Sequence, residues 1–324
     1  MLKEFAYSKP KSIQEAVGML QAPGAALHAG GTDLIGCMRD GVLEVNRVVS
    51  LSGIAELKKI QPRDDGGLEI GALVTIAEIA ENAVVRKSYT AFSEAAASVA
   101  SPQLRAQGTL GGNLCQRPRC WYFRGDFHCL RKGGDLCYAA AGQNQYHCIF
   151  GGEGCFIVHP SDTATALVAL NAQAVIAGPS GARTIPLESF FVLPAQDSTK
   201  ENNLKPGEIL TSVILPAPAA GMRSSYRKVR ERADWDFALA GAAVALHGKG
   251  AVRDPRLVLS GVAPIPWRCA DAEKVMDQRI LDPAVAARAA KAAVSGAKPL
   301  EYNSYKIPMV RGLVEETLLS FIGS

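Results

Sequence analysis

The chain has 324 residues, of which 48% are hydrophobic and 20% charged, an ordinary composition for a globular protein of two domains or three lobes. Its net charge is only +4 and it has no long basic run, which argues against a nucleic-acid-binding protein. The polar N-terminus lacks the apolar core of a signal peptide, and no apolar run approaches the roughly 20 residues of a membrane span. We therefore expect a soluble protein with no export signal of its own.

The N-terminal stretch predicts an α/β lobe. A helix should begin at Ser12, because Glu15 follows three residues later as in a capping box. Strands are expected at 26–28 and 47–51, and the first of them runs directly into the glycine turn AGGTDL.

The middle of the chain alternates strands and helices around a cysteine-rich segment without helical or strand periodicity, which we interpret as an irregular insert. Thr75 and Glu78 predict a second capping box, and a second glycine turn, GTLGGN, precedes the insert. The other expected elements are strands at 68–70, 173–177 and 209–215, and helices over 90–100 and from Ser161 or Asp162 onward.

The C-terminal part predicts a separate α+β domain behind the linker PAPAAG at 216–221. Residues 237–247 and 256–262 should form a hairpin, and helices are expected near 270–277, 283–295 and 309–321. The preceding basic stretch, 223–232, is typical of a solvated strand or loop, with a ligand contact as the alternative.

The chain has eight cysteines, and six of them lie in the insert: Cys115, Cys120, Cys129, Cys137, Cys148 and Cys155. The other two are Cys37 and Cys269. Without a secretory signal, such a cluster indicates metal binding or catalysis more strongly than disulfides. The spacings are wide and no C-x-x-C pair occurs, which disfavours a zinc ribbon and suits a [4Fe–4S] cube held by four thiolates.

The insert also carries cations that could offset the negative charge of four thiolates. They are Arg117, Arg119, Arg124, Arg131 and Lys132. Two alternatives stay open at this point: a zinc site that uses His128, His147 or His159, or inert thiols.

Both glycine turns favour a phosphate-bearing ligand. In AGGTDL, Gly30 and Gly31 allow close approach of the backbone, Thr32 adds a hydroxyl, and Asp33 can accept from a backbone N–H or a ribose hydroxyl. GTLGGN repeats this pattern with Thr109 as the donor. Neither turn matches a dinucleotide fingerprint or a P-loop, so tight bends remain the simpler alternative.

Four segments in this order resemble the FAD-binding medium subunit of the xanthine oxidase (molybdenum hydroxylase) family: AGGTDLIGCM, SPQLRAQGTLGGNLCQ, HPSDTATALVAL and YRKVRERADWDFAL. The resemblance runs essentially end to end. The insert is similar to the subset with an extra [4Fe–4S] cluster, the aldehyde oxidoreductase and 4-hydroxybenzoyl-CoA reductase types. It implies Cys120, Cys129, Cys137 and Cys155 as cluster ligands, with Cys115 and Cys148 as neighbours.

The resemblance also implies the FAD contacts. Residues Ala29, Gly30, Gly31, Thr32, Asp33 and Leu34 should wrap the pyrophosphate; Ser101, Thr109, Gly112 and Asn113 should line a second strip; and Asp162 and Lys228 should lie near one end of the cofactor. Asp162 could also cap its helix, and Lys228 could be a solvated charge.

The implied fold is α+β: a two-lobed vanillyl-alcohol-oxidase-like (PCMH-type) FAD-binding domain over 1–219 and a smaller C-terminal α+β domain over 220–324. The lobes should span about 1–55 and 56–219, with the iron–sulfur insert at 115–158.

The implied function is electron transfer in an oxidoreductase complex. A large subunit should carry the molybdenum cofactor and a small subunit two [2Fe–2S] clusters, and this chain should exchange electrons with an external carrier such as ferredoxin or NAD, with no catalytic acid or base of its own. A cytoplasmic location is expected, unless a partner's twin-arginine signal exports the complex. The rival hypotheses are a stand-alone flavin reductase and a zinc-stabilised interaction module.

Overall fold

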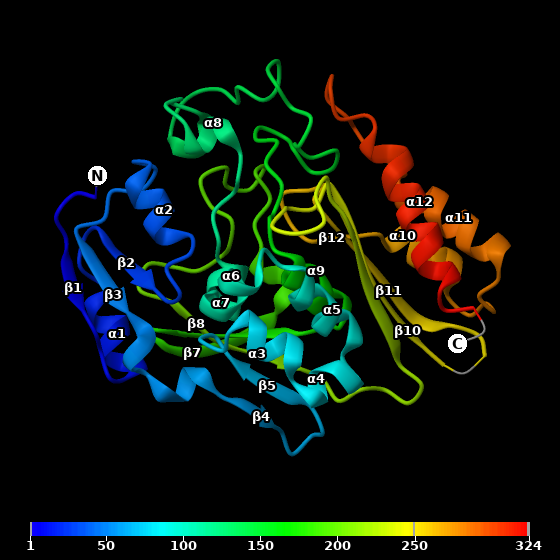
Figure 1. Ribbon diagram of the computed structural model, residues 1–324, viewed down its shortest axis with the longest axis horizontal. Helices are drawn as coiled ribbons and strands as arrows, with labels where there is room; N and C mark the ends of the chain where they lie inside the picture. The colour runs from blue at the N-terminus through cyan, green and yellow to red at the C-terminus, as the bar shows by residue number, and fades with distance from the viewer. Residues whose placement is uncertain (1, 249, 323–324) are drawn as a thin grey trace.

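The computed structural model describes residues 2–248 and 250–322. Helices and strands alternate with irregular segments, and the strands form three sheets that follow one another along the chain (Figure 1). This mixed architecture confirms the predicted α+β class.

The first lobe is a parallel sheet in the order β1-β3-β2, with α1 between β1 and β2 along the chain and α2 between β2 and β3. Its elements are β1 (Ala6–Ser8), α1 (Ile13–Met19), β2 (Ala25–His28), α2 (Leu34–Arg39), β3 (Arg47–Ser50), η1 (Leu51–Gly53) and η2 (Ala55–Lys58). Ser12 caps α1 as predicted, accepting from the N–H of Glu15. The capping box is incomplete, because the Glu15 carboxylate accepts from the N–H of Lys11 instead.

The second lobe is a five-stranded antiparallel sheet in the order β4-β5-β8-β6-β7, with six helices. The strands are β4 (Ile60–Pro62), β5 (Leu68–Gly71), β6 (Gln173–Gly178), β7 (Gly181–Pro186) and β8 (Ile209–Leu215). The helices are α3 (Ile76–Glu81), α4 (Ala83–Ser88), α5 (Thr90–Ser98), α6 (Pro102–Gln107), α7 (Leu110–Leu114) and α9 (Asp162–Ala169), with η4 at Leu187–Phe190. The capping box of Thr75 and Glu78 is confirmed at the start of α3.

The C-terminal part is an antiparallel sheet in the order β12-β11-β10-β9, followed by three helices. Its elements are β9 (Arg223–Val229), β10 (Ala240–His247), β11 (Arg253–Ser260), β12 (Trp267–Arg268), α10 (Ala270–Met276), α11 (Pro283–Ala293) and α12 (Lys306–Leu319). The predicted hairpin is confirmed as the pairing of β10 with β11.

This C-terminal sheet is covered on both faces. Ala243 and Ala245 of β10 pack in the core of the second lobe, whereas Val244 and Leu246 pack in the core formed with α10 to α12. Successive strand residues point to opposite faces, so a strand buried on both sides reads as continuously apolar. The shared core docks β9 and β11 against α5 and α9, which brings the C-terminal sheet to the edge of the site described below.

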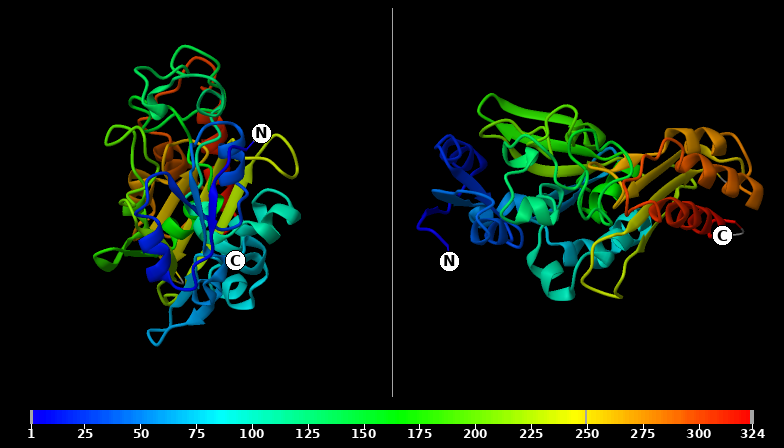
Figure 2. Two further views of the ribbon diagram at one scale, coloured as in Figure 1. Left: turned by 90° about the vertical axis from the view of Figure 1, so that its left-hand side faces the viewer. Right: turned by 90° about the horizontal axis from the view of Figure 1, so that it is seen from above.

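The insert forms an irregular cap above α6 and α7, beside the C-terminal helices (Figures 1 and 2). It contains only two short helices among the described residues, α8 (Trp121–Arg124) and η3 (Leu130–Lys132), which agrees with the irregular segment predicted. Its return path is fastened to the C-terminal part: Asn303 Nδ2 donates to the carbonyl oxygens of His147 and Cys148 at 3.1 and 3.0 Å.

In the described parts of the chain, no helix is long and apolar enough to cross a membrane.

Replacing Thr75 with Ala should weaken the second lobe, because the first turn of α3 loses its side-chain cap. Such a loss costs about 1 kcal/mol and should lower the thermal unfolding midpoint by about 2–4 °C. Thr75→Ser is the matched control, since it keeps the hydroxyl. Equal midpoints for the two variants in a circular-dichroism melt would contradict this account.

Candidate functional site

The two glycine turns lie against each other. The Nε2 of Gln107, just before the second turn, donates to the carbonyl oxygen of Gly30 at 3.2 Å. A Cβ on Gly30 would overlap the carbonyl oxygen of Gln107, so only glycine allows this approach. Gly31 has a φ of +74°, which also favours glycine. The sequence predicted that the two turns together fit a dinucleotide, but it did not predict this direct contact between them.

The first turn lines a cavity of about 230 Å³ between the first and second lobes, here called the turn cavity. All six residues predicted to wrap a pyrophosphate line it: Ala29, Gly30, Gly31, Thr32, Asp33 and Leu34. Thr109 and Gly112 of the second turn lie on the same wall. The hydroxyl of Thr32 makes no hydrogen bond to another described residue, which leaves a donor for a ligand.

A second space of about 310 Å³, the central cavity, continues from the turn cavity and shares Thr32, Thr109 and Gly112 with it. Asn113 lines it and fixes α7 to α9, because its Oδ1 accepts from the hydroxyls of Ser161 and Thr163 at 2.5 and 2.7 Å.

Asp162 and Lys228 form a buried ion pair at the central cavity, with Nζ and Oδ2 2.8 Å apart and side chains only 5% and 4% exposed. Burial raises the pKa of Tyr226, so its hydroxyl stays protonated and donates to Asp162 at 2.6 Å.

The structure corrects two alternatives that the sequence left open for Asp162 and Lys228. Ser161, rather than Asp162, caps α9, and Lys228 is buried rather than solvated.

Ser101 is not among the residues that line the central cavity. Its hydroxyl caps α6 by accepting from the N–H of Leu104 at 3.4 Å, while the neighbouring Val99 and Ala100 line the central cavity. Several residues that line the central cavity were not selected from the sequence as cofactor contacts: Gln116, Arg119, Arg232, Trp235, Asp236 and Phe237. The last four stand in the segment YRKVRERADWDFAL, from which only Lys228 was selected.

Asp33 joins the first glycine turn to the beginning of the insert. Its carboxylate accepts from the N–H of Arg117 at 2.7 Å, pairs with Arg119, and accepts from Nη2 of Arg124 at 2.8 Å. Burial alone would raise the pKa of Asp33, but the two guanidinium groups and the N–H hold it below its usual value. From the sequence, Asp33 could accept from a backbone N–H or from a ribose hydroxyl. In the structure its carboxylate accepts from the backbone N–H of Arg117.

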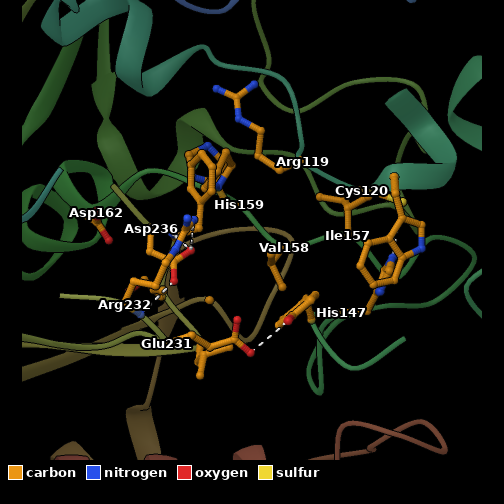
Figure 3. Close-up of a pocket in the computed structure, with 18 residues that line it drawn as sticks. Arg119, Cys120, His147, Ile157, Val158, His159, Asp162, Glu231, Arg232 and Asp236 are labelled. Carbon is orange, nitrogen blue, oxygen red and sulfur yellow. Dashed lines mark hydrogen bonds and ion pairs between the residues drawn. The ribbon is translucent and has the colours of Figure 1, made fainter. Parts of the chain in front are cut away.

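A third space of about 310 Å³, the bridging cavity, lies between the central cavity and the insert (Figure 3). It shares Arg119 and Asp162 with the central cavity. Figure 3 shows Cys120 and His147 on one side of it and Asp162 on the other.

Four cysteines converge on a small fourth space, the cysteine cavity, within the insert. They are Cys120, Cys129, Cys137 and Cys155, the set expected as cluster ligands. Cys115 lies instead on the wall of the turn cavity, and Cys148 is not among the residues that line the four cavities.

One thiol of the cysteine cavity is strongly acidified. A hydrogen bond from Cys137 lowers the pKa of Cys155 to about 6 against the effect of burial, and the Arg131 guanidinium adds to this. Burial raises the pKa of Cys120 to about 11 and lowers that of His147 to about 4, so His147 is neutral at its contact with Cys120, 3.3 Å from Nε2 to Sγ.

Within residues 2–248 and 250–322, no three His, Cys, Asp or Glu side chains are arranged to hold a single metal ion. The four thiols of the cysteine cavity line a common space without forming a site for one ion.

The turn and central cavities together fit an elongated dinucleotide. Backbone turns and an unpartnered Thr32 hydroxyl lie at one end, and a buried charge pair with aromatic neighbours at the other. Thr32, Gly31 and Gly112 would hold phosphates, and Lys228 would donate to the polar edge of a ring system.

Two protein-family models match the chain. Residues 3–218 match the FAD binding domain in molybdopterin dehydrogenase, and residues 224–321 match the CO dehydrogenase flavoprotein C-terminal domain.

Among curated proteins, the chain is 38% identical over 282 residues to the aldehyde oxidoreductase FAD-binding subunit PaoB of Escherichia coli, covering 86% of this chain and 87% of that protein. It is 27% identical to the carbon monoxide dehydrogenase medium chain of Hydrogenophaga pseudoflava, covering 97% and 96%. The solved carbon monoxide dehydrogenase of H. pseudoflava that lacks the Mo-pyranopterin moiety superposes with a TM-score of 0.78 at 26% identity, covering 98% and 97%.

Replacing Gly30 with Ala should separate the two turns and weaken FAD binding at least about tenfold, equivalent to 1.4 kcal/mol. Gly36→Ala is the matched control, because a Cβ on Gly36 meets no neighbouring atom. Flavin content after gel filtration measures the effect. Full FAD occupancy in Gly30→Ala would show that the contact between the turns does not shape the site.

Proposed function

Because the chain belongs to the FAD-binding subunits of the xanthine oxidase and carbon monoxide dehydrogenase family, we propose that it relays electrons in a molybdenum hydroxylase complex through FAD and a [4Fe–4S] cluster. The relay runs between a [2Fe–2S] small subunit and an external carrier. The large subunit holds the molybdenum cofactor and performs the chemistry on the organic substrate.

One observation carries the proposal: the bridging cavity is lined by Asp162 of the central cavity and by Cys120 of the cysteine cavity. The positions proposed for the flavin and the cluster are therefore neighbours, separated by a single cavity rather than by a domain. Two redox groups need such proximity to exchange electrons, and a structural metal would not.

The cysteine cavity supports the cluster through the charge of Arg131 as well as through its thiols. Arg131 lines the cavity beside Cys155. The Nη2 of Arg131 is buried and has no hydrogen-bond partner in the described part of the chain. A buried donor of this kind calls for an acceptor, which the sulfur atoms of an anionic cluster provide.

The chain's own residues bind and orient rather than act as acid or base. FAD, when bound, supplies a carrier that accepts electrons in pairs or singly. Thr32 and the glycine turns hold its phosphates, while the Asp162–Lys228 pair fixes a charge pattern at the ring end. Tyr226 keeps Asp162 in place by donating to it.

The remaining parts of the proposal concern assembly. We assign the FAD-binding domain to 1–219, with lobes at about 1–55 and 56–219, and the C-terminal domain to 220–324. The location proposed is cytoplasmic, with export alongside a partner as the alternative. The external carrier is a ferredoxin, NAD or a similar redox molecule.

Metal and flavin analysis of the purified chain should find about four irons and one FAD, as a four-iron cube and a single flavin site require. Cys120→Ser should bleach the visible absorption of the cluster and retain most of the FAD, because Cys120 lines the cysteine cavity and neither of the two cavities assigned to FAD. Cys148→Ser, a buried cysteine of the same insert outside the cavity, should keep its iron.

Finding zinc without flavin would contradict the proposed electron relay and favour a zinc-stabilised interaction module. Iron retained in Cys120→Ser but lost in Cys148→Ser would reject the ligand assignment.

Expressed with the neighbouring genes of its source, the tagged chain should co-purify with two other chains, one containing molybdenum and one containing [2Fe–2S] clusters. Mass spectrometry and metal analysis of the eluate identify them. An isolated chain that oxidises or reduces an organic substrate with NAD(P)H or oxygen would instead favour the stand-alone flavin reductase.

A further inference from the structure

Arg131 lines the cysteine cavity and donates a hydrogen bond there in addition to its positive charge. Its Nε donates to Sγ of Cys155 at 3.4 Å, and its Nη1 donates to Oε1 of Glu201 at 2.6 Å. The side chain is only 1% exposed, so neither interaction is screened by water. Its remaining nitrogen, Nη2, is buried and unpartnered among the described residues.

Glu201 fixes this arginine from outside the insert. It lies in the segment before β8, and its side chain is 5% exposed. Its second oxygen pairs with Nε of Arg117 at 2.9 Å. Arg117 is in turn held through its N–H by Asp33 of the first glycine turn. Contacts between side chains therefore connect the turn cavity to Cys155 through the partly buried Asp33, Arg117, the buried Glu201 and Arg131.

From this geometry we infer that Arg131 is a positioning residue that tunes the redox group of the cysteine cavity, and that Glu201 sets its orientation. The inference rests on the proposed function, because it presumes a cluster ligated by Cys155. It adds a role for a residue that ligates nothing and lies outside the flavin contacts.

The sign of the effect follows from charge. A cluster on four thiolates carries net negative charge, and reduction adds one more negative charge. A buried guanidinium at a ligand sulfur favours the reduced form, and hydrogen bonds to sulfur act in the same direction. Arg131 therefore raises the midpoint potential, whereas the carboxylate of Glu201 lowers it.

Arg131→Gln should make one-electron reduction of the cluster at least tenfold less favourable, a midpoint lower by 59 mV or more. Lys132→Gln is the matched control: it removes the same charge from the next residue, whose Nζ donates to Gly125 and which does not line the cysteine cavity. Its midpoint should stay near that of the wild type. The measurement is a redox titration of the full-length chain, with its co-purifying partners, followed by electron paramagnetic resonance.

Glu201→Gln should shift the midpoint upward, because it removes a negative charge and keeps a side chain that can accept from Arg131. Opposite shifts for Arg131→Gln and Glu201→Gln distinguish electrostatic tuning from a packing defect, which would impair both variants alike. Equal midpoints for Arg131→Gln and Lys132→Gln would overturn the inference.

If Arg131→Gln does not retain iron, Glu201→Gln decides: a raised midpoint supports the inference, and an unchanged or lowered midpoint overturns it. Absence of iron from the wild-type chain would be a failure of the proposed function itself. The iron content of the wild type therefore separates the two failures.

Discussion

The carboxylate of Asp33 is the contact on which the arrangement of both sites depends. It stands at the end of the first glycine turn and gathers the N–H of Arg117 and the guanidinium groups of Arg119 and Arg124. A buried carboxylate without these partners would be costly, and the arginines without it would repel one another at the start of the insert. The turn that faces the presumed cofactor therefore also anchors the cysteine-rich segment.

This anchoring explains why the insert caps the site and does not hang from it as an independent module. Its first residues are held by the first lobe through Asp33, and its last residues by Asn303 of the C-terminal part. Between these attachments the insert has little regular structure, and its backbone polar groups pair mostly in short turns of its own, such as the N–H of Leu130 with the carbonyl oxygen of Leu136. The cysteines are thereby fixed at a short distance from the central cavity without a helix or sheet to carry them.

The features that sequence could predict are those decided by neighbouring residues. The capping box of Thr75, the hairpin of β10 and β11 and the irregular insert are local patterns, and the structure has them. The partners of Asp33 lie more than eighty residues away, and no local rule selects them. Lys228 was expected near the cofactor, with a solvated charge as the alternative, and docking of the C-terminal sheet on α9 buries it against Asp162. Local patterns say nothing of such docking, and Ser101 shows the same limit: its position suited the cavity, yet its hydroxyl caps α6.

Buried or partly buried ion pairs lie beside each part of the site. Lys228 with Asp162 lies at the central cavity, Asp33 with its arginines at the junction, and Glu201 with Arg131 at the cysteine cavity. Each pair is costly to bury and adds little net stability compared with an apolar core, so stability alone does not account for them. Fixed charges that cannot reorient do, however, change the free energy of reduction, oxidation or protonation of any nearby group. The relay proposed here, with two redox groups, would make use of such charges beside the central and cysteine cavities.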